Sequence, residues 1–125
     1  MIRQIGQVML YMEDQDQAVR FWRDKVGFVV VEEVDHGDGL RWIEIAPQAG
    51  APTTFVLQNK AWVARHEPEL NTGTPSIMLY SDDVEGLYRS FQEKGITVGE
   101  MVEMGGGKVF NFADDENNYF AVMQH

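Results

Sequence analysis

The four residues Val8-Met9-Leu10-Tyr11 recur 69 positions later as Ile77-Met78-Leu79-Tyr80. Acidic residues follow each copy, Glu13-Asp14 after the first and Asp82-Asp83 after the second. An aspartate in this place suits the N-cap of a helix, where its carboxylate accepts free backbone N–H groups. A strand-like segment followed by the N-cap of a helix therefore occurs twice, which predicts an internal repeat. This repeat determines the fold that we expect.

An amphipathic helix is expected after each copy, because apolar residues recur there at spacings of three and four. Each helix should end at a Lys-(Val)-Gly signal, with Gly27 and Gly95 suited to the left-handed position after the last turn. The apolar stripes are Ala18, Phe21, Trp22 and Val26 in the first helix, and Val84, Leu87, Tyr88 and Phe91 in the second.

After each helix the apolar period drops towards two, which is typical of strands. Each half therefore reads β-α-β-β-β, an α+β fold. A module with one helix cannot bury its own sheet well, so we expect a single domain over 1–125. Module one covers about 4–59, a linker 60–75 and module two about 76–125. The expected strands are 28–31, 41–45 and 53–58 in the first half, and 96–98, 108–112 and 119–123 in the second.

The composition excludes several partners. The chain has 125 residues, 20 acidic and 10 basic, for a net charge of −10. Sequence-independent nucleic-acid binding and binding to an anionic membrane both need clustered Lys and Arg. No cysteine is present, which excludes disulfides and thiolate metal sites. No signal-peptide pattern and no membrane-length apolar run occur, so we expect a cytoplasmic protein.

Two motifs support a family resemblance: Asp14-x3-Ala18-x2-Phe21-Trp22-x4-Gly27-Phe28, and the closing stretch from Phe112 to Phe120. Together with the duplication, they make the chain similar to the vicinal oxygen chelate superfamily. That group includes glyoxalase I, extradiol dioxygenases, fosfomycin resistance proteins and bleomycin-type drug-binding proteins. The resemblance implies two tandem βαβββ modules whose strands curl into a single mixed β-sheet cup with the helices outside. It also implies a homodimer.

The closing motif differs from the family's turn, since Asp115 replaces proline and Asn117 replaces glycine. Asparagine tolerates positive φ better than other non-glycine residues, so we expect the turn to persist.

The resemblance also implies positions for metal ligands, one near the start of the first strand and one on the last strand of each module. Those positions hold Gln7, Val56, Ser76 and Ala121. A catalytic metal site needs at least three protein ligands, and only Gln7 is suitable. We therefore predict neither a metal nor another cofactor. The sequence assigns no catalytic residue, and it leaves open whether the chain is an enzyme.

The three histidines are expected to be solvated surface residues, since none stands at metal-ligand spacing. They are His36, His66 and His125.

Alternation places one set of side chains on the inner face of the expected cup. The set is mainly apolar, aromatic and rich in methionine, with a few polar groups, which suits an organic ligand held by stacking and shape. The alternative for each residue is a core role in a filled barrel. The candidate ligand-binding residues are Gln7, Met9, Tyr11, Trp42, Glu44, Val56, Gln58, Ser76, Met78, Tyr80, Phe110, Tyr119, Ala121 and Met123.

The leading hypothesis is a metal-independent small-molecule-binding protein similar to the bleomycin-type drug-sequestering proteins. Its ligand would be a small organic compound, cationic and aromatic, steered by an acidic rim that includes Glu32, Glu33 and Asp35. The alternative for these acids is a solvated strand edge that resists aggregation. Two alternatives stay open. One is a metal-dependent lyase, isomerase or dioxygenase of the glyoxalase type with ligands elsewhere in the chain. The other is a non-catalytic protein-interaction module.

Overall fold

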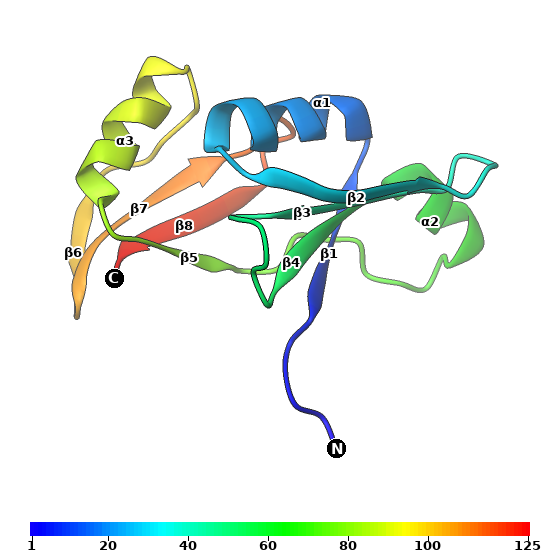
Figure 1. Cartoon of the computed structure of the whole chain (residues 1–125). Coiled ribbons are helices and arrows are strands. Elements are labelled where there is room, and N and C mark those ends of the chain that lie inside the picture. The colour runs from blue at the N-terminus through cyan, green and yellow to red at the C-terminus, as the bar shows by residue number, and fades with distance from the viewer. The chain divides into compact units, whose positions relative to one another are not determined.

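A computed structural model describes residues 1–125, which divide into two compact units, Met1–Gly73 and Thr74–His125 (Figure 1). The boundary falls inside the predicted linker, 60–75. Each unit contains one copy of the repeated strand and helix. That the two units form one domain and one cup stays a prediction.

Unit 1 contains one four-stranded mixed sheet in the order β1-β4-β3-β2. β1 runs parallel to β4, and the other neighbouring pairs are antiparallel. The elements are β1 (Gln7–Met12), α1 (Gln15–Arg20), which continues as the π-helical segment η1 (Phe21–Val26), β2 (Val29–Asp35), β3 (Arg41–Ala46), β4 (Thr54–Asn59) and α2 (Lys60–His66).

The signals that start and end the first helix act as predicted. The Asp14 carboxylate accepts a hydrogen bond from the Gln17 amide at 3.0 Å, which satisfies one of the free donors of the first turn. At the other end Gly27 has φ 96°, in the left-handed region that favours glycine. The helix therefore begins and ends for local reasons.

The core of unit 1 lies between this helix and the sheet. Trp22 is completely buried, and its ring lies 4.9 Å from that of Phe28 and 5.6 Å from that of Phe55. Leu10, Ile43 and other apolar strand residues are buried beneath it. The aromatic pairs are tilted or edge-on, which is a favourable geometry beyond simple burial.

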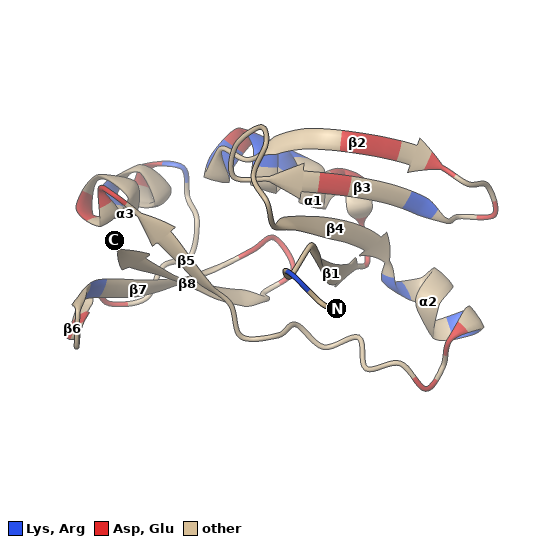
Figure 2. Cartoon of the chain, turned by 60° about the horizontal axis from the view of Figure 1, so that its bottom comes forward, with Lys and Arg blue, Asp and Glu red and all other residues tan.

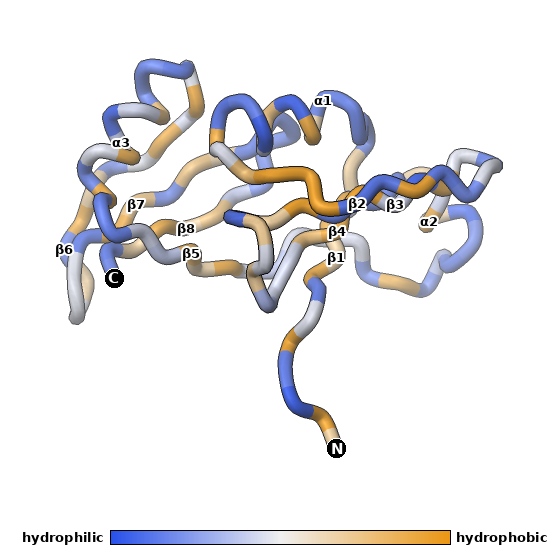
Figure 3. The backbone as a smooth tube through the Cα atoms, viewed as in Figure 1, coloured by the Kyte–Doolittle hydropathy of each residue, from blue (hydrophilic) through white to orange (hydrophobic).

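The edge strand β2 changes character along its length. Its first residues, Val29 to Val31, are apolar and partly exposed, whereas Glu32, Glu33 and Asp35 follow (Figure 3). Charged residues on an edge strand discourage pairing with another sheet. The acidic rim expected from the sequence therefore lies on an edge strand.

Unit 2 repeats the arrangement with a sheet in the order β5-β8-β7-β6. β5 is parallel to β8, and the remaining pairs are antiparallel. Asp83 caps the helix by accepting from the Gly86 amide at 3.0 Å, and Gly95 follows it with φ 75°. The elements are β5 (Met78–Ser81), α3 (Val84–Glu93), β6 (Val102–Met104), β7 (Gly107–Ala113) and β8 (Tyr119–Gln124).

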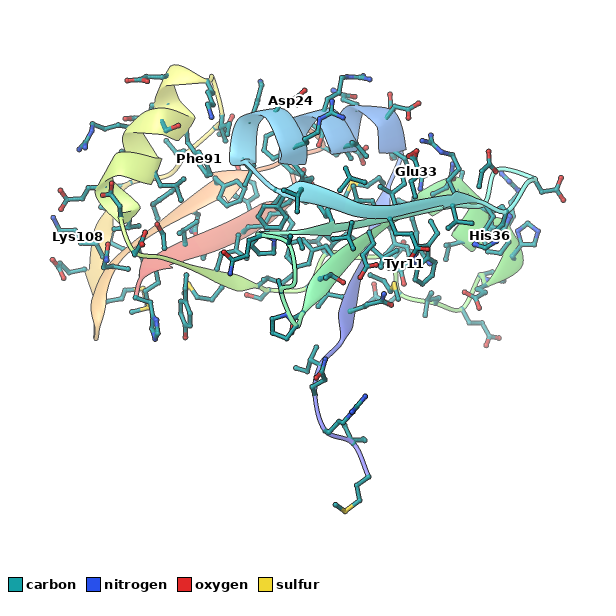
Figure 4. The ribbon with its side chains drawn as sticks, viewed as in Figure 1. Tyr11, Asp24, Glu33, His36, Phe91 and Lys108 are labelled. Atoms are coloured by element: carbon teal, nitrogen blue, oxygen red, sulfur yellow. The ribbon has the colours of Figure 1, made fainter.

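Phe91 anchors the core of unit 2. It points from α3 towards the sheet (Figure 4), and its ring lies 5.8 Å from that of Phe110 and 5.0 Å from that of Phe112. Phe112 in turn stacks on Phe120 at 5.6 Å. This phenylalanine cluster takes the place that the Trp22 cluster takes in unit 1.

Two predicted segments differ from the structure. The stretch 96–98 was expected to be a strand, but only Val98 pairs, through an isolated bridge to Phe112, and the edge strand is β6 further along. The predicted linker 60–75 begins with a helix, α2. Asn59 caps α2 by accepting from the Trp62 amide at 2.9 Å, and this signal precedes Pro68, the first proline of the predicted linker.

The predicted turn with Asn117 is confirmed. Asn117 has φ 62°, and the Asp114 carboxylate accepts from the amides of Glu116 and Asn118 at 2.9 and 2.8 Å. A turn of this kind needs one residue with positive φ, and asparagine supplies it in place of glycine.

The α+β class and the duplicated β-α-β-β-β modules are confirmed, with two mixed sheets that do not close. None of the helices combines the length and the apolar character needed to cross a membrane.

Candidate functional site

In unit 1, α1 packs on one side of the sheet. We call the other side the open side, although Val56 and Thr54 on it are buried. Arg41 marks the helix side, because it forms an ion pair with Asp16 of α1 at 2.8 Å and another with Glu33 at 2.9 Å. Successive residues of a strand point to opposite sides. Trp42 and Glu44 therefore face the open side. Figure 4 shows Glu33 on the helix side and Tyr11 on the open side.

Strand register arranges the open side of unit 1 in rows. One row crosses all four strands and holds Met9, Val56, Glu44 and Glu32. The row on one side of it pairs Gln7 with Thr54. The row on the other side pairs Tyr11 with Gln58, and Trp42 with Val34.

Glu44 is the charged residue at the centre of this open side. Its Oε2 atom accepts from the Thr54 hydroxyl at 2.7 Å and from the Gln7 side-chain amide at 3.4 Å. These partners come from β4 and β1, so residues from three strands meet at one carboxylate. Figure 2 shows acidic segments on the neighbouring strands β2 and β3, where register sets Glu32 opposite Glu44.

Tyr11 lies at the end of β1 on the same open side. Burial and the negative charge of Glu67 both raise the pKa of Tyr11 above its ordinary value. The phenol therefore keeps its proton at neutral pH and can donate a hydrogen bond. Its ring gives the open side an aromatic surface besides Trp42.

The open side of unit 2 is more exposed and carries no carboxylate. One row holds Met78, Ala121 and Asn111, and the next holds Tyr80, Met123 and Val109. Tyr119 pairs with Ala113 at the end of the sheet and is 57% exposed. Ser76 is an exposed residue that precedes β5. The open side of unit 2 therefore has methionine and tyrosine side chains and one amide, that of Asn111.

Phe110 is a correction to the candidate set. It is buried on the helix side, where its ring lies 5.0 Å from that of Tyr88. Alternation in β7 instead puts Val109 and Asn111 on the open side. The aromatic identity of Phe110 suggested a ligand-facing residue, but the same apolar character draws it under α3. Phe112 lies two residues from Phe110 on the same side of β7 and packs on Phe91 of α3. Had Phe112 been assigned to the core, alternation would have placed Phe110 there as well.

The side chains at the four metal-ligand positions of the family do not fit a metal. Gln7 offers an amide and Ser76 a hydroxyl, whereas Val56 and Ala121 have no donor atom. Within either unit, no three His, Asp or Glu side chains gather in a way that could hold an ion. We therefore derive no chemistry through a metal at these positions.

The three histidines are exposed, as expected, and two of them stack on aromatic rings. The His66 ring lies 4.1 Å from that of Trp62, and the His125 ring lies 4.2 Å from that of Tyr80. His36 lies at the tip of the β2–β3 hairpin (Figure 4). The stack of His125 on Tyr80 borders the open side of unit 2.

Two hollows lie away from the candidate residues. One, of about 510 Å³, is lined by residues 66–70, and the other, of about 330 Å³, lies beside the start of α3. The second contains Lys108 and Glu85, which form an ion pair. Neither of these two hollows is lined by a predicted ligand-binding residue.

Comparisons with known proteins agree with this architecture. The family model for the Glyoxalase/Bleomycin resistance protein/Dioxygenase superfamily matches residues 4–122. YetH, an uncharacterized protein of Bacillus subtilis (strain 168), is 34% identical over 125 residues, covering 99% of this chain and 100% of YetH. TnmS3, an antibiotic binding protein from Streptomyces sp. CB03234, has 27% identity and a TM-score of 0.83, covering 98% of this chain and 96% of TnmS3.

A superfamily member from Sphaerobacter thermophilus DSM 20745 has a TM-score of 0.85 at 24% identity, covering 99% of this chain and 98% of that protein, which supports the fold alone. The family match spans nearly the whole chain and both modules. The chain belongs to the Glyoxalase/Bleomycin resistance protein/Dioxygenase superfamily.

Proposed function

We propose that this protein binds a small organic molecule without transforming it, and needs no metal or cofactor to do so. The observation that carries the proposal is the open side of unit 1, where Trp42, Tyr11 and Met9 offer apolar and aromatic surface around a few polar groups. Such a combination holds a ligand by stacking and shape, with sparse hydrogen bonds to fix its orientation.

The comparisons support the same class of function. TnmS3 is named as an antibiotic binding protein, and it matches this chain over nearly its whole length. One fold serves many functions, so the likeness supports the class of ligand only. We infer an antibiotic-like organic compound of modest size.

The ligand's charge follows from the acidic surface. With a net charge of −10 and the rim of Glu32, Glu33 and Asp35 on β2, the protein attracts cations from a distance. Aromatic side chains add a favourable contact for a cation over their faces. The proposed ligand is therefore cationic and aromatic, and we expect its binding to weaken as salt concentration rises.

We also propose that the protein acts in the cytoplasm. From the family resemblance we propose that it pairs as a homodimer whose second copy helps to enclose the ligand. Sedimentation equilibrium with and without ligand measures the oligomeric state, and a monomer under both conditions contradicts the dimer.

The test is a binding screen with a matched pair of tryptophan variants. Trp42 lies on the open side, whereas Trp62 stacks on His66 of α2. Calorimetric titration with a panel of cationic, neutral and anionic aromatic compounds should give one-to-one binding per chain for cationic members. Trp42→Ala should weaken that binding by about tenfold or more, whereas Trp62→Ala should leave it within about twofold.

Other outcomes favour the alternatives. A metal that copurifies in stoichiometric amount, and is lost in Gln7→Ala, contradicts binding without a metal and favours a glyoxalase-type enzyme. Failure of every compound in the panel, together with equal behaviour of the two tryptophan variants, contradicts ligand binding and favours a protein-interaction module.

A further inference from the structure

We propose that Glu44 determines the ligand specificity of the open side of unit 1 by pairing directly with a positively charged nitrogen of the ligand. The inference rests on the proposed function and names the contact that would select a cation. It differs from attraction by the acidic rim, because it requires one carboxylate at contact distance rather than the summed field of many.

The hydrogen bonds of Glu44 hold its carboxylate in place. Both the Thr54 hydroxyl and the Gln7 amide donate to the same oxygen, Oε2. The other oxygen, Oε1, is left to accept from a ligand. A group fixed in this way loses less conformational freedom when it binds than a freely rotating side chain does.

The charge of Glu44 is not neutralised within unit 1. Its two hydrogen-bond donors are neutral, and no ion pair joins Glu44 to a lysine or arginine. Glu33, on the opposite side of the same sheet, contacts Arg41 at 2.9 Å. Arg41 therefore lies on the helix side of the sheet, whereas the carboxylate of Glu44 on the open side has no cationic partner.

Glu32 increases the negative charge at this place. It stands directly opposite Glu44 across the antiparallel strands β2 and β3. Like charges directly opposite each other in a sheet are destabilising. A cation that binds beside them removes this repulsion, so the pair favours a positively charged ligand over a neutral one of the same shape.

The neighbours of Glu44 indicate what the rest of the ligand is like. Val56 and Met9 continue the same row, and Trp42 lies two residues away on the same side of β3. Val56 is completely buried, whereas Met9 and Trp42 are partly exposed and present apolar and aromatic surface beside one carboxylate. The class of ligand that matches is an amine or quaternary ammonium group attached to a planar aromatic body.

The two units differ at this point. In unit 2 the row of Met78 and Ala121 ends at Asn111, which takes the place that Glu44 takes beside Met9 and Val56. An amide carries no net charge and cannot pair with a cation. The structure therefore assigns charge selection to unit 1.

The experiment compares two aromatic probes that share a ring system. Proflavine is cationic at mildly alkaline pH, and acridine is neutral there. Fluorescence titration of the full chain measures both affinities. We expect wild type to prefer proflavine by about tenfold or more, the range for a hydrogen bond to a charged group. Glu44→Gln should abolish most of that preference while leaving acridine binding within about twofold.

Control variants separate contact from general attraction. Asp16→Asn removes one negative charge on the helix side, outside the acidic rim, and should keep the preference within about twofold. Glu32→Gln should reduce it by an intermediate factor. Thermal unfolding shows whether Glu44→Gln folds. Glu44→Asp provides a second test, because it keeps the negative charge on a shorter side chain and should retain part of the preference.

The outcomes distinguish the two proposals. If wild type binds both probes equally, or Glu44→Gln keeps the preference, Glu44 does not select the ligand, and the small-molecule proposal stands. If Asp16→Asn and Glu44→Gln lower the preference equally, the effect is long-range attraction and the contact is contradicted. If wild type binds neither probe, both proposals are contradicted for planar aromatic ligands.

Discussion

The two units build the same module from different side chains. In each, an aspartate caps the helix, a glycine in the left-handed region follows it, and an ion pair joins the first helical turn to a strand. That ion pair is Asp16–Arg41 in unit 1 and Glu85–Lys108 in unit 2. Between helix and sheet, both units have an aromatic cluster, around Trp22 in one and Phe91 in the other.

The open sides of the sheets differ far more. Unit 1 has a carboxylate held by Thr54 and Gln7, whereas unit 2 has Asn111 at the same place and exposed methionine and tyrosine. The helix side is constrained because close packing penalises changes of volume there. The open side is free to vary, and so it is where the two modules differ in the chemistry they offer a ligand.

The largest expected effect tests the shared helix sides. Trp22→Ala and Phe91→Ala should each destabilise the protein by about 3–5 kcal/mol, because each removes a buried aromatic ring and leaves a cavity. Met78→Ala, on the open side where the residue is 45% exposed, should change stability by less than about 0.5 kcal/mol. Urea unfolding measures all three. A large loss for Met78→Ala would break the contrast between the two sides.

The next effect tests a difference at the start of the two helices. Gln15 is buried and donates to the carbonyls of Arg41 and Leu57, both at 2.9 Å, whereas the matching residue in unit 2 is Val84. Gln15→Val copies unit 2 but leaves those carbonyls without this partner. We expect a loss of about 1–3 kcal/mol in the free energy of unfolding.

The control for that variant is Gln17→Val, in the same turn but exposed, which should cost less than about 0.5 kcal/mol. Equal losses for the two glutamines would indicate that helix propensity, rather than the two hydrogen bonds, accounts for the cost.

The smallest effect concerns the ion pair of unit 2. A hydrogen bond from Lys108 and its positive charge lower the pKa of Glu85 below its ordinary value. A lowered pKa stabilises the folded state above the carboxyl's ordinary pKa, and this stabilisation is lost as the pH falls through the folded value. Lys108→Gln should therefore raise the pKa of Glu85 and make stability less sensitive to mild acid.

Carbon-detected NMR titration of the Glu85 carboxyl measures this change directly. Both side chains are solvent-exposed, so we expect little change in stability at neutral pH. An unchanged Glu85 pKa in Lys108→Gln would show that the ion pair does not form in solution.

Much of the fold could be predicted because its signals are local. The caps at Asp14 and Asp83 and the glycines at 27 and 95 act within one helical turn. Asn117 could be predicted to adopt positive φ for the same reason. Alternation also indicated that Met9, Tyr11, Met78 and Tyr80 point to the sides of the strands opposite α1 and α3.

The errors arose where packing outweighed local pattern. Phe110 was expected to face a ligand because it is aromatic, but its side chain is buried under α3, where it contacts Tyr88. The β-branched stretch 96–98 has the composition of a strand, yet it pairs at one residue only, and β6 is the edge strand.

The sequence by itself determined the duplication, the β-α-β-β-β order of each module and the family, because each is recognised from local patterns that recur along the chain. Only the tertiary structure decided that Glu44 meets Gln7 and Thr54, and that Arg41 pairs on the opposite side of the sheet. Those contacts join residues that are distant in sequence. The hydrophobic pattern indicates which side of a strand a residue faces, but the register between strands decides which residues lie beside each other.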